Sequence, residues 1–216
     1  MEGEGLITLA IARGRLLKEA AAVLKKTGLP IGEFYNDSRK LIFEFPEAGL
    51  KIFIIRPSDV PSYVEYGAAD CGIVGKDTLM EEKHNLYEPL DLGIGRCKLV
   101  VAAPRGFDFS PYRPLRVATK YPKISYEHFV RKGITTEIVK LYGSVELAPI
   151  VGLSDVIVDL SATGETLRKN KLVEIETIAN ITAKLVVNKV SMKVKSRELK
   201  EFVNKLKRYR TLLATG

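Results

Sequence analysis

Short apolar segments alternate along this chain with segments of helical periodicity, and this alternation restricts the fold more than any other feature. Residues 6–12, 71–74 and 156–160 are predicted strands, and each leads through a glycine-containing turn into a predicted helix. Strands that alternate with helices indicate an α/β protein. In open α/β sheets ligands bind beyond the C-terminal ends of the strands, which is where all three turns fall.

The remaining segments extend this pattern over the whole chain. Further strands are predicted at residues 41–45, 51–55, 97–103, 115–119, 135–141, 173–181 and 184–188. Helices are predicted at residues 16–27, from a Ser58 cap to Gly67, at 125–132 and 146–151, and near the C-terminus. The last of these carries an apolar stripe at helical spacing: Leu199, Phe202, Val203, Leu206 and Tyr209.

The stretch from residue 143 to 167, GSVELAPIVGLSDVIVDLSATGETL, holds the strongest functional signal. Its strand contains Asp159, and the small-residue turn 161–164 leads into a helix at Glu165. Such a turn offers backbone amides, the hydroxyls of Thr163 and Thr166, and the positive end of a helix dipole to an anion. Asp159 could accept hydrogen bonds from sugar hydroxyls. The pattern predicts a sugar-phosphate pocket, and the alternative is a capped turn without a ligand.

The wider spacing of this stretch resembles the signature of the ATP phosphoribosyltransferases, the family that catalyses the first committed step of histidine biosynthesis. The matching positions are Glu146, Gly152, Ser154, Ile157, Asp159, Leu160, Thr163, Gly164, Thr166 and Leu167. Four other segments also look like family segments and follow in family order: RGRL at 13–16, RPSDVPSYVEYGAADCGIVGKD at 56–77, CKLVVA at 97–102 and RVATKYP at 116–122.

The resemblance implies a fold and a division of the chain. Members look like a two-lobed, periplasmic-binding-protein-like (type II) fold with the active site in the inter-lobe cleft. We therefore expect residues 1–95 and 183–216 to form lobe I, and residues 96–182 to form lobe II with the phosphoribosyl loop. The pattern of strands and helices alone does not show that the chain returns to its first lobe.

The resemblance also implies the reaction, in which N1 of ATP attacks C1 of phosphoribosyl pyrophosphate and expels pyrophosphate. The expected binding residues for phosphoribosyl pyrophosphate are Asp159, Ser161, Ala162, Thr163, Gly164, Glu165 and Thr166, and the expected catalytic carboxylates are Asp159 and Glu146. For Glu146 a solvent-facing position on its helix is an equal alternative.

Four residues at the ends of other predicted strands are expected to contact ATP: Gly14 and Arg15 after residues 6–12, Arg56 after residues 51–55 and Asp77 after residues 71–74. A structural salt bridge is the alternative for Arg56, and a helix cap is the alternative for Asp77. The roles of Arg15 and Arg56 could also be swapped between ATP and phosphoribosyl pyrophosphate. The expected cofactor is Mg²⁺ held mainly by substrate oxygens, as this ion prefers, with no dedicated protein site.

The expected partners follow from the same resemblance. Long members of the family carry an additional C-terminal domain of roughly 75 residues that binds histidine. This chain ends at Gly216 and resembles the short form instead. The short form depends on a separate regulatory subunit similar to histidyl-tRNA synthetase. We expect a homodimer and a hetero-oligomer with that subunit.

Composition excludes several other classes. The net charge of +8 suggests nucleic-acid binding, but no recognised motif accompanies the basic residues, so we expect a solvated helix face and no nucleic-acid partner. No signal peptide or membrane-length apolar segment is present, and we expect a cytoplasmic enzyme without a membrane partner.

The two histidines and two cysteines form no zinc or catalytic motif. A two-lobed anion-binding module without catalysis is the alternative function.

Overall fold

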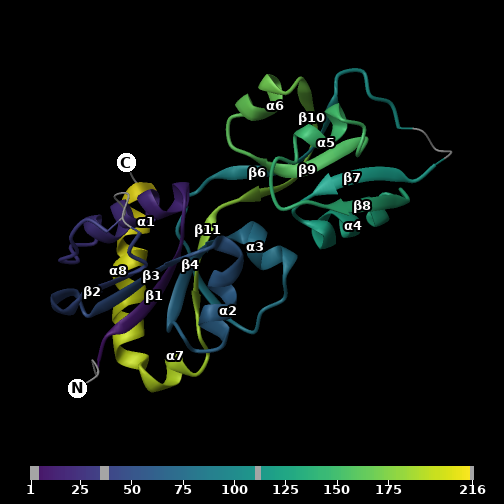
Figure 1. The fold of residues 1–216 in the computed structure, drawn as a ribbon. Helices are drawn as coiled ribbons and strands as arrows, with labels where there is room; N and C mark the ends of the chain where they lie inside the picture. The colour runs from purple at the N-terminus through teal and green to yellow at the C-terminus, as the bar shows by residue number, and fades with distance from the viewer. Residues whose placement is uncertain (1–4, 35–38, 110–112, 215–216) are drawn as a thin grey trace. The chain divides into compact units, whose positions relative to one another are not determined.

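The computed structural model describes residues 5–34, 39–109 and 113–214 and has the α/β architecture that the alternating pattern predicts (Figure 1). The chain forms two compact units, each with its own mixed sheet. Unit 1 comprises Met1–Leu79, Lys83–Gly95 and Thr182–Gly216, and unit 2 comprises Met80–Glu82 and Arg96–Ile181. The last segment of the chain thus returns to the unit in which the chain begins.

Unit 1 is built on a six-stranded sheet with the order β2-β3-β1-β4-β11-β5. Its strands are β1 (Ile7–Ala12), β2 (Ile42–Phe45), β3 (Leu50–Ile55), β4 (Cys71–Gly75), β5 (Tyr87–Asp91) and β11 (Ala183–Val187). Because β3, β1 and β4 are mutually parallel, their C-terminal ends lie at one edge of the sheet. The other pairs in this sheet are antiparallel.

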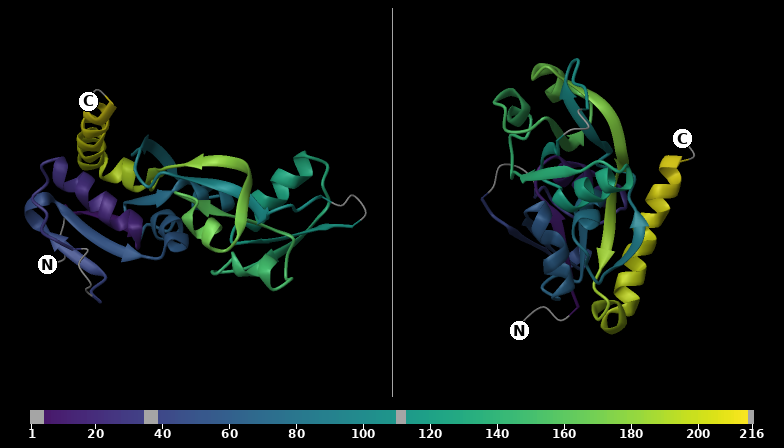
Figure 2. Two further views of the ribbon diagram at one scale, coloured as in Figure 1. Left: turned by 90° about the horizontal axis from the view of Figure 1, so that it is seen from above. Right: turned by 90° about the vertical axis from the view of Figure 1, so that its right-hand side faces the viewer.

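Helices cover both faces of this sheet. The helices of unit 1, with the short 3-10 turns, are α1 (Arg15–Lys26), η1 (Pro46–Ala48), η2 (Pro57–Asp59), α2 (Val60–Glu65), α3 (Lys76–Glu81, whose last two residues belong to unit 2), α7 (Ser191–Val194) and α8 (Ser196–Ala214). Helices α1 and α8 pack side by side on one face, as the turned views show (Figure 2). Four residues of the predicted stripe on α8 are buried there, with Leu199 and Leu206 fully enclosed, and Tyr209 is partly buried. Helix α2 covers the opposite face through Val60 and Val64.

Unit 2 is built on a five-stranded sheet with the order β10-β6-β9-β7-β8. Its strands are β6 (Cys97–Pro104), β7 (Leu115–Thr119), β8 (Thr136–Lys140), β9 (Val156–Ser161) and β10 (Leu172–Ile181). Helix α4 (Pro122–Arg131) packs on the face that holds Val156 and Val158. Helices α5 (Leu147–Ile150) and α6 (Glu165–Lys169) lie over the other face, which holds Ile157.

The structure corrects the sequence predictions at three points. The predicted Ser58 cap is wrong, because this hydroxyl donates to the Asp59 carboxylate and helix α2 begins after a 3-10 turn. Helix α4 begins at Pro122 rather than at Ser125. Strand β5 was not predicted, because this exposed edge strand contains Pro89 and lacks an apolar alternation. Among the described residues, no helix is long and apolar enough to cross a membrane.

Candidate functional site

The turn at the end of β9 has a fixed shape that depends on one glycine. Gly164 has a φ of +71°, in the left-handed region that glycine adopts without strain. Ser161, the last residue of β9, is buried, whereas Ala162 and Thr163 are exposed. The amide of Glu165 lies 3.4 Å from Thr163 Oγ1, and the chain then enters α6.

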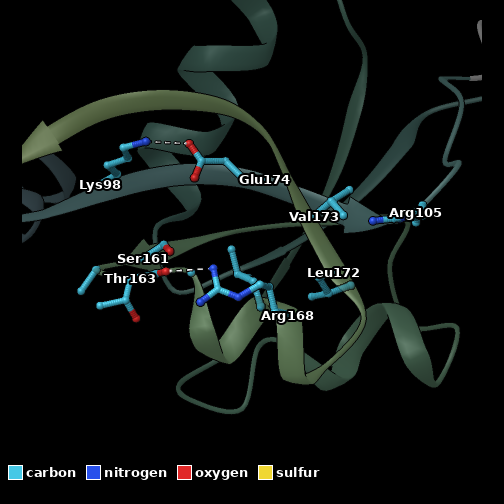
Figure 3. A pocket seen from close by; sticks show the side chains of 11 residues that line it. Lys98, Arg105, Ser161, Thr163, Arg168, Leu172, Val173 and Glu174 are labelled. Carbon is cyan, nitrogen blue, oxygen red and sulfur yellow. Dashed lines mark hydrogen bonds and ion pairs between the residues drawn. The ribbon is translucent and has the colours of Figure 1, made fainter.

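This turn forms one wall of a pocket of about 390 Å³ that lies entirely within unit 2 (Figure 3). The pocket is lined by Lys98, Arg105, Ser161, Ala162, Thr163, Gly164, Leu167, Arg168, Leu172, Val173 and Glu174. The loop therefore faces a hollow on the protein surface, as a ligand-binding loop must. Helix α6 is short, so the loop and its cationic neighbours, rather than a long helix dipole, supply the positive field.

Three basic side chains and one carboxylate line this pocket. The Lys98 ammonium lies 3.2 Å from Glu174 Oε1, and Arg168 Nη1 donates to the Thr163 carbonyl at 3.1 Å (Figure 3). Arg105 lies at the end of β6. A hydrogen bond from Thr177 and the neighbouring Lys98 lower the pKa of Glu174 from its ordinary value, so it is ionised at neutral pH. Positive charge outnumbers negative charge in the pocket, and the site favours an anion.

These basic residues were not predicted from the sequence, because only the fold brings two of them to the turn. Lys98 lies directly opposite Ser161 in the antiparallel pair of β6 and β9, a register that no local pattern reveals. Arg105 and Glu174 reach the pocket because β6 pairs with both β9 and β10. Arg168 could have been found from the sequence, since it follows the signature turn by one helical turn.

The two predicted catalytic carboxylates lie over one face of the unit 2 sheet. Successive side chains of a strand point to opposite faces, so Asp159 lies on the same face of the sheet as Ile157. Its partner in the neighbouring strand β6 is Val100. Asp159 Oδ1 accepts a hydrogen bond from the Leu160 amide at 2.8 Å. Glu146 immediately precedes α5, which packs over the same face, and its side chain is partly exposed. Among the described residues, neither carboxylate belongs to the set that lines the pocket of the turn.

The four residues predicted to contact ATP gather at one edge of the unit 1 sheet. Gly14 and Arg15 follow β1, Arg56 follows β3 and Asp77 follows β4, and these three strands are parallel neighbours. Residues at the C-terminal ends of such strands are placed to share one ligand. The topology therefore brings together residues that lie up to 63 positions apart in the sequence.

The local environments of these four residues differ. Gly14 has a φ of +93° and a ψ of −149°, a conformation that is essentially restricted to glycine. Arg15 is exposed and lies 3.6 Å from Glu19, and Arg56 is also exposed. Asp77 is buried, and its carboxylate covers Gly75 so closely that a Cβ at Gly75 would lie 2.1 Å from Oδ1. The Asp77 carboxylate thus packs against the β4–α3 turn, and its contact with a nucleotide stays a prediction.

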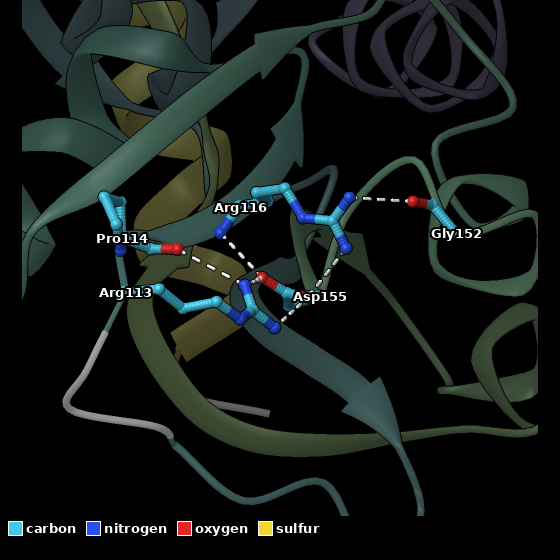
Figure 4. A network of polar contacts seen from close by, with 5 residues as sticks. All are labelled: Arg113, Pro114, Arg116, Gly152 and Asp155. Atoms are coloured by element: carbon cyan, nitrogen blue, oxygen red, sulfur yellow. Dashed lines mark hydrogen bonds and ion pairs between the residues drawn. The ribbon is translucent and has the colours of Figure 1, made fainter.

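A buried carboxylate anchors the loop that leads into β9 (Figure 4). Asp155 accepts hydrogen bonds from Arg113 at 2.6 and 2.9 Å, and from the Arg116 side chain and amide at 3.0 and 2.9 Å. Arg116 also donates to the Gly152 carbonyl. The hydrogen bonds of Arg113, followed by those of Arg116, hold the pKa of Asp155 well below its usual range despite its burial. This network joins β7 to the start of the strand that bears the turn.

The fold and the site together define a two-lobed α/β protein with a pocket lined by three basic side chains. A sequence model described as ATP phosphoribosyltransferase matches residues 56–208. A relative in Geobacter sulfurreducens named ATP phosphoribosyltransferase 2 is 52% identical over 207 residues, covering 94% of this chain and 98% of the relative. A relative in Caldanaerobacter subterraneus subsp. tengcongensis, named ATP phosphoribosyltransferase, is 50% identical over 202 residues, covering 94% and 96% of the two chains.

Two solved structures resemble this chain in fold. A chain of the ATP phosphoribosyl transferase (HisG:HisZ) complex from Thermotoga maritima has a TM-score of 0.82 and 36% identity, covering 95% of this chain and 99% of that chain. The periplasmic aliphatic sulphonate binding protein SsuA from Escherichia coli has a TM-score of 0.61 and 10% identity, covering 99% and 75%, which shows the shared fold alone. The predicted fold class is confirmed. The chain belongs to the ATP phosphoribosyltransferase family, the glycosyltransferases of the first step of histidine biosynthesis.

Proposed function

We propose that this chain transfers the 5-phosphoribosyl group of phosphoribosyl pyrophosphate to N1 of ATP, with the 5-phosphate bound in the pocket of unit 2. The main supporting observation is that the family signature loop, residues 161–164, lines a basic pocket. Ser161, Ala162, Thr163, Gly164, Glu165 and Thr166 supply amides and hydroxyls to the phosphate oxygens. Hydrogen bonds to a charged oxygen are shorter and stronger than neutral ones.

Two carboxylates are proposed to act on the ribose. The N1 lone pair forms a bond to C1 as the C1–oxygen bond to pyrophosphate breaks, so positive charge develops on the sugar. Asp159 holds the ribose hydroxyls and, with Glu146, stabilises that charge electrostatically. Their position over one face of the sheet, the face covered by α5 and α6, supports this assignment. Because N1 carries a free lone pair, the reaction needs orientation more than a general base.

Gly14, Arg15, Arg56 and Asp77 are proposed to bind ATP at the edge of the unit 1 sheet. The exposed guanidinium groups of Arg15 and Arg56 can pair with phosphate oxygens in a bidentate manner. The glycine-only backbone at Gly14 allows a ligand to approach the chain closely. The alternative for Arg15 is its surface pair with Glu19, which is weak in water and can be exchanged for a phosphate.

Members of the family use a divalent metal ion, and we propose Mg²⁺. Mg²⁺ keeps several waters and binds readily to substrate phosphates, so the oxygens of phosphoribosyl pyrophosphate would hold most of this ion. Among the residues that the structure describes, no three His, Cys, Asp or Glu side chains form a cluster for a metal ion. When bound with the substrate, the ion neutralises charge on the leaving pyrophosphate.

The first experiment is a turnover assay that follows the absorbance of N1-substituted adenine at about 290 nm, with ATP, phosphoribosyl pyrophosphate, Mg²⁺ and pyrophosphatase present. A rise that requires both substrates supports the transferase. The control is the Asp159→Asn variant, which should fold normally and turn over slowly. No rise, with or without a regulatory subunit, would refute the proposal.

We also propose that the chain works in the cytoplasm as a homodimer within a hetero-oligomer that includes a histidyl-tRNA-synthetase-like regulatory subunit. The solved HisG:HisZ complex from Thermotoga maritima supports this assembly, because 99% of its matched chain aligns here. The alternative, an anion-binding module without catalysis, is not favoured. The binding protein of similar fold is only 10% identical to this chain, whereas the named transferases reach 52%.

A further inference from the structure

Arg168, which is not among the predicted phosphate-binding residues, donates hydrogen bonds to the carbonyl groups of the signature turn, residues 161–164. Arg168 lies on α6, next to Leu167, whose burial in the core of unit 2 fixes the helix on the sheet. The Arg168 amide donates to the Gly164 carbonyl at 3.0 Å, and its Nη1 donates to the Thr163 carbonyl at 3.1 Å. One residue thus fixes two successive carbonyl groups of the turn.

The guanidinium group also faces the pocket. Figure 3 shows the Arg168 side chain reaching back from α6 towards Thr163 and Ser161, and Arg168 lines the cavity. A Cβ built on Gly164 would lie 3.1 Å from Nη1, so the guanidinium group packs directly on the turn. A side chain at position 164 would displace it.

The charge of Arg168 is not neutralised within the part of the chain that the structure describes. Lys98 pairs with Glu174, and Lys169, the next residue on α6, pairs with Glu165 at 2.7 Å. The Arg168 guanidinium group forms no ion pair among the described residues, and its one hydrogen bond there, to the Thr163 carbonyl, engages one of its five N–H donors. A planar guanidinium with free donors matches the geometry of a phosphate group.

We propose that Arg168 binds the 5-phosphate of phosphoribosyl pyrophosphate directly while it holds the turn through the Thr163 carbonyl. This inference rests on the proposed position of the 5-phosphate and adds a guanidinium group to a loop of amides and hydroxyls. Arg168 contacts the phosphate that does not react, so its contribution is to the affinity for the phosphoribosyl end of the substrate.

The test compares Arg168→Met and Arg168→Lys with Lys169→Met, a control on the same helix whose side chain is 74% exposed. Isothermal titration would measure the Kd of phosphoribosyl pyrophosphate, and competition would measure ribose 5-phosphate and pyrophosphate separately. Arg168→Met should weaken both ligands that carry the 5-phosphate by roughly 10- to 100-fold and leave pyrophosphate unchanged. Arg168→Lys should recover only part of the loss, because it restores the charge without the planar donors. Lys169→Met should change each Kd by less than about 2-fold.

Two further measurements keep the outcomes separate. Circular dichroism and thermal unfolding must show that each variant is folded. Thr163→Val combined with Thr166→Val is measured in parallel on ribose 5-phosphate. If the threonine variant loses affinity and Arg168→Met does not, the role of Arg168 is refuted and the pocket stands. If neither loses affinity, the proposed phosphate site is itself wrong. Equal losses for ribose 5-phosphate and pyrophosphate would also overturn the inference, because they would indicate a general collapse of the site.

Discussion

The buried carboxylate of Asp155 allows a prediction whose size follows from the structure. The side chain is 7% exposed and accepts four hydrogen bonds, from Arg113, the Arg116 side chain and the Arg116 amide. Asp155→Asn removes the charge and places an amide N–H₂ group against these donors. Breaking a fully buried pair costs about 3–5 kcal/mol. The Arg113 and Arg116 side chains are 52% and 37% exposed, so water can replace the hydrogen bonds that they lose. We therefore expect the free energy of unfolding to fall by about 2–4 kcal/mol.

Urea unfolding followed by circular dichroism would measure the loss, and hydrogen exchange of the β7 and β9 amides would locate it in unit 2. The matched control is Glu201→Gln, which breaks an exposed ion pair with Arg197 on α8 whose side chains are 85% and 65% exposed. This control should change the free energy of unfolding by at most about 0.5 kcal/mol. A loss below about 1 kcal/mol for Asp155→Asn would refute the assignment of the network as an anchor.

The pH dependence of the same variant gives an independent check. The hydrogen bonds of Arg113 lower the pKa of Asp155 in the folded state, so the unfolded state binds the proton more readily. The stability that Asp155 provides is therefore complete above its unfolded pKa of about 3.9 and is lost as the pH falls towards the folded value. The difference between wild type and Asp155→Asn should be constant near neutral pH and should narrow below about pH 4. A difference that does not change on acidification would show that the charge is not responsible.

Three further predictions concern the proposed site. Thr163→Val with Thr166→Val should weaken phosphoribosyl pyrophosphate binding by about 1–3 kcal/mol, measured by titration, because hydrogen bonds to a charged phosphate are lost; an unchanged Kd would remove the loop from the site. Asp159→Asn should lower kcat while the unfolding curve keeps its midpoint, since the carboxylate is proposed to stabilise charge in the transition state; normal turnover would show that its charge is not used. Gly14→Ala should cost about 1–3 kcal/mol of stability in urea unfolding, because its backbone conformation is essentially restricted to glycine; a cost near zero would show that the turn relaxes.

Local sequence was sufficient for most strands and for the turn at the end of β9. Apolar periodicity predicted β9 to within one residue of its observed end, because a buried strand needs a continuous apolar run. The turn at 161–164 was also predictable, because small residues and a glycine between a strand and a helix are typical of a turn. In the structure Gly164 has the left-handed backbone that glycine adopts without strain. Whether Asp159 and Glu146 act on the sugar stays a prediction for the experiments above.

Other features depend on contacts between distant segments. Helix α4 begins at Pro122 because the carboxylate of Glu81 accepts hydrogen bonds from the Lys123 and Ile124 amides at 2.9 and 3.0 Å. These amides have no partner inside the helix, so a distant acceptor decides where the helix starts. Ser125, the predicted start, instead donates to the Tyr121 carbonyl.

The pocket at the end of β9 also combines features set by local sequence with features set by contacts between distant segments. The sequence by itself determined the turn, its glycine and its hydroxyls, because backbone conformation and capping are set by residues a few positions apart. Only the tertiary structure decided which charges surround that turn. Lys98 reaches Ser161 through the register of β6 against β9, and Glu174 reaches Lys98 from β10. Strand register is fixed by the burial of whole sheet faces, and no local pattern contains that information.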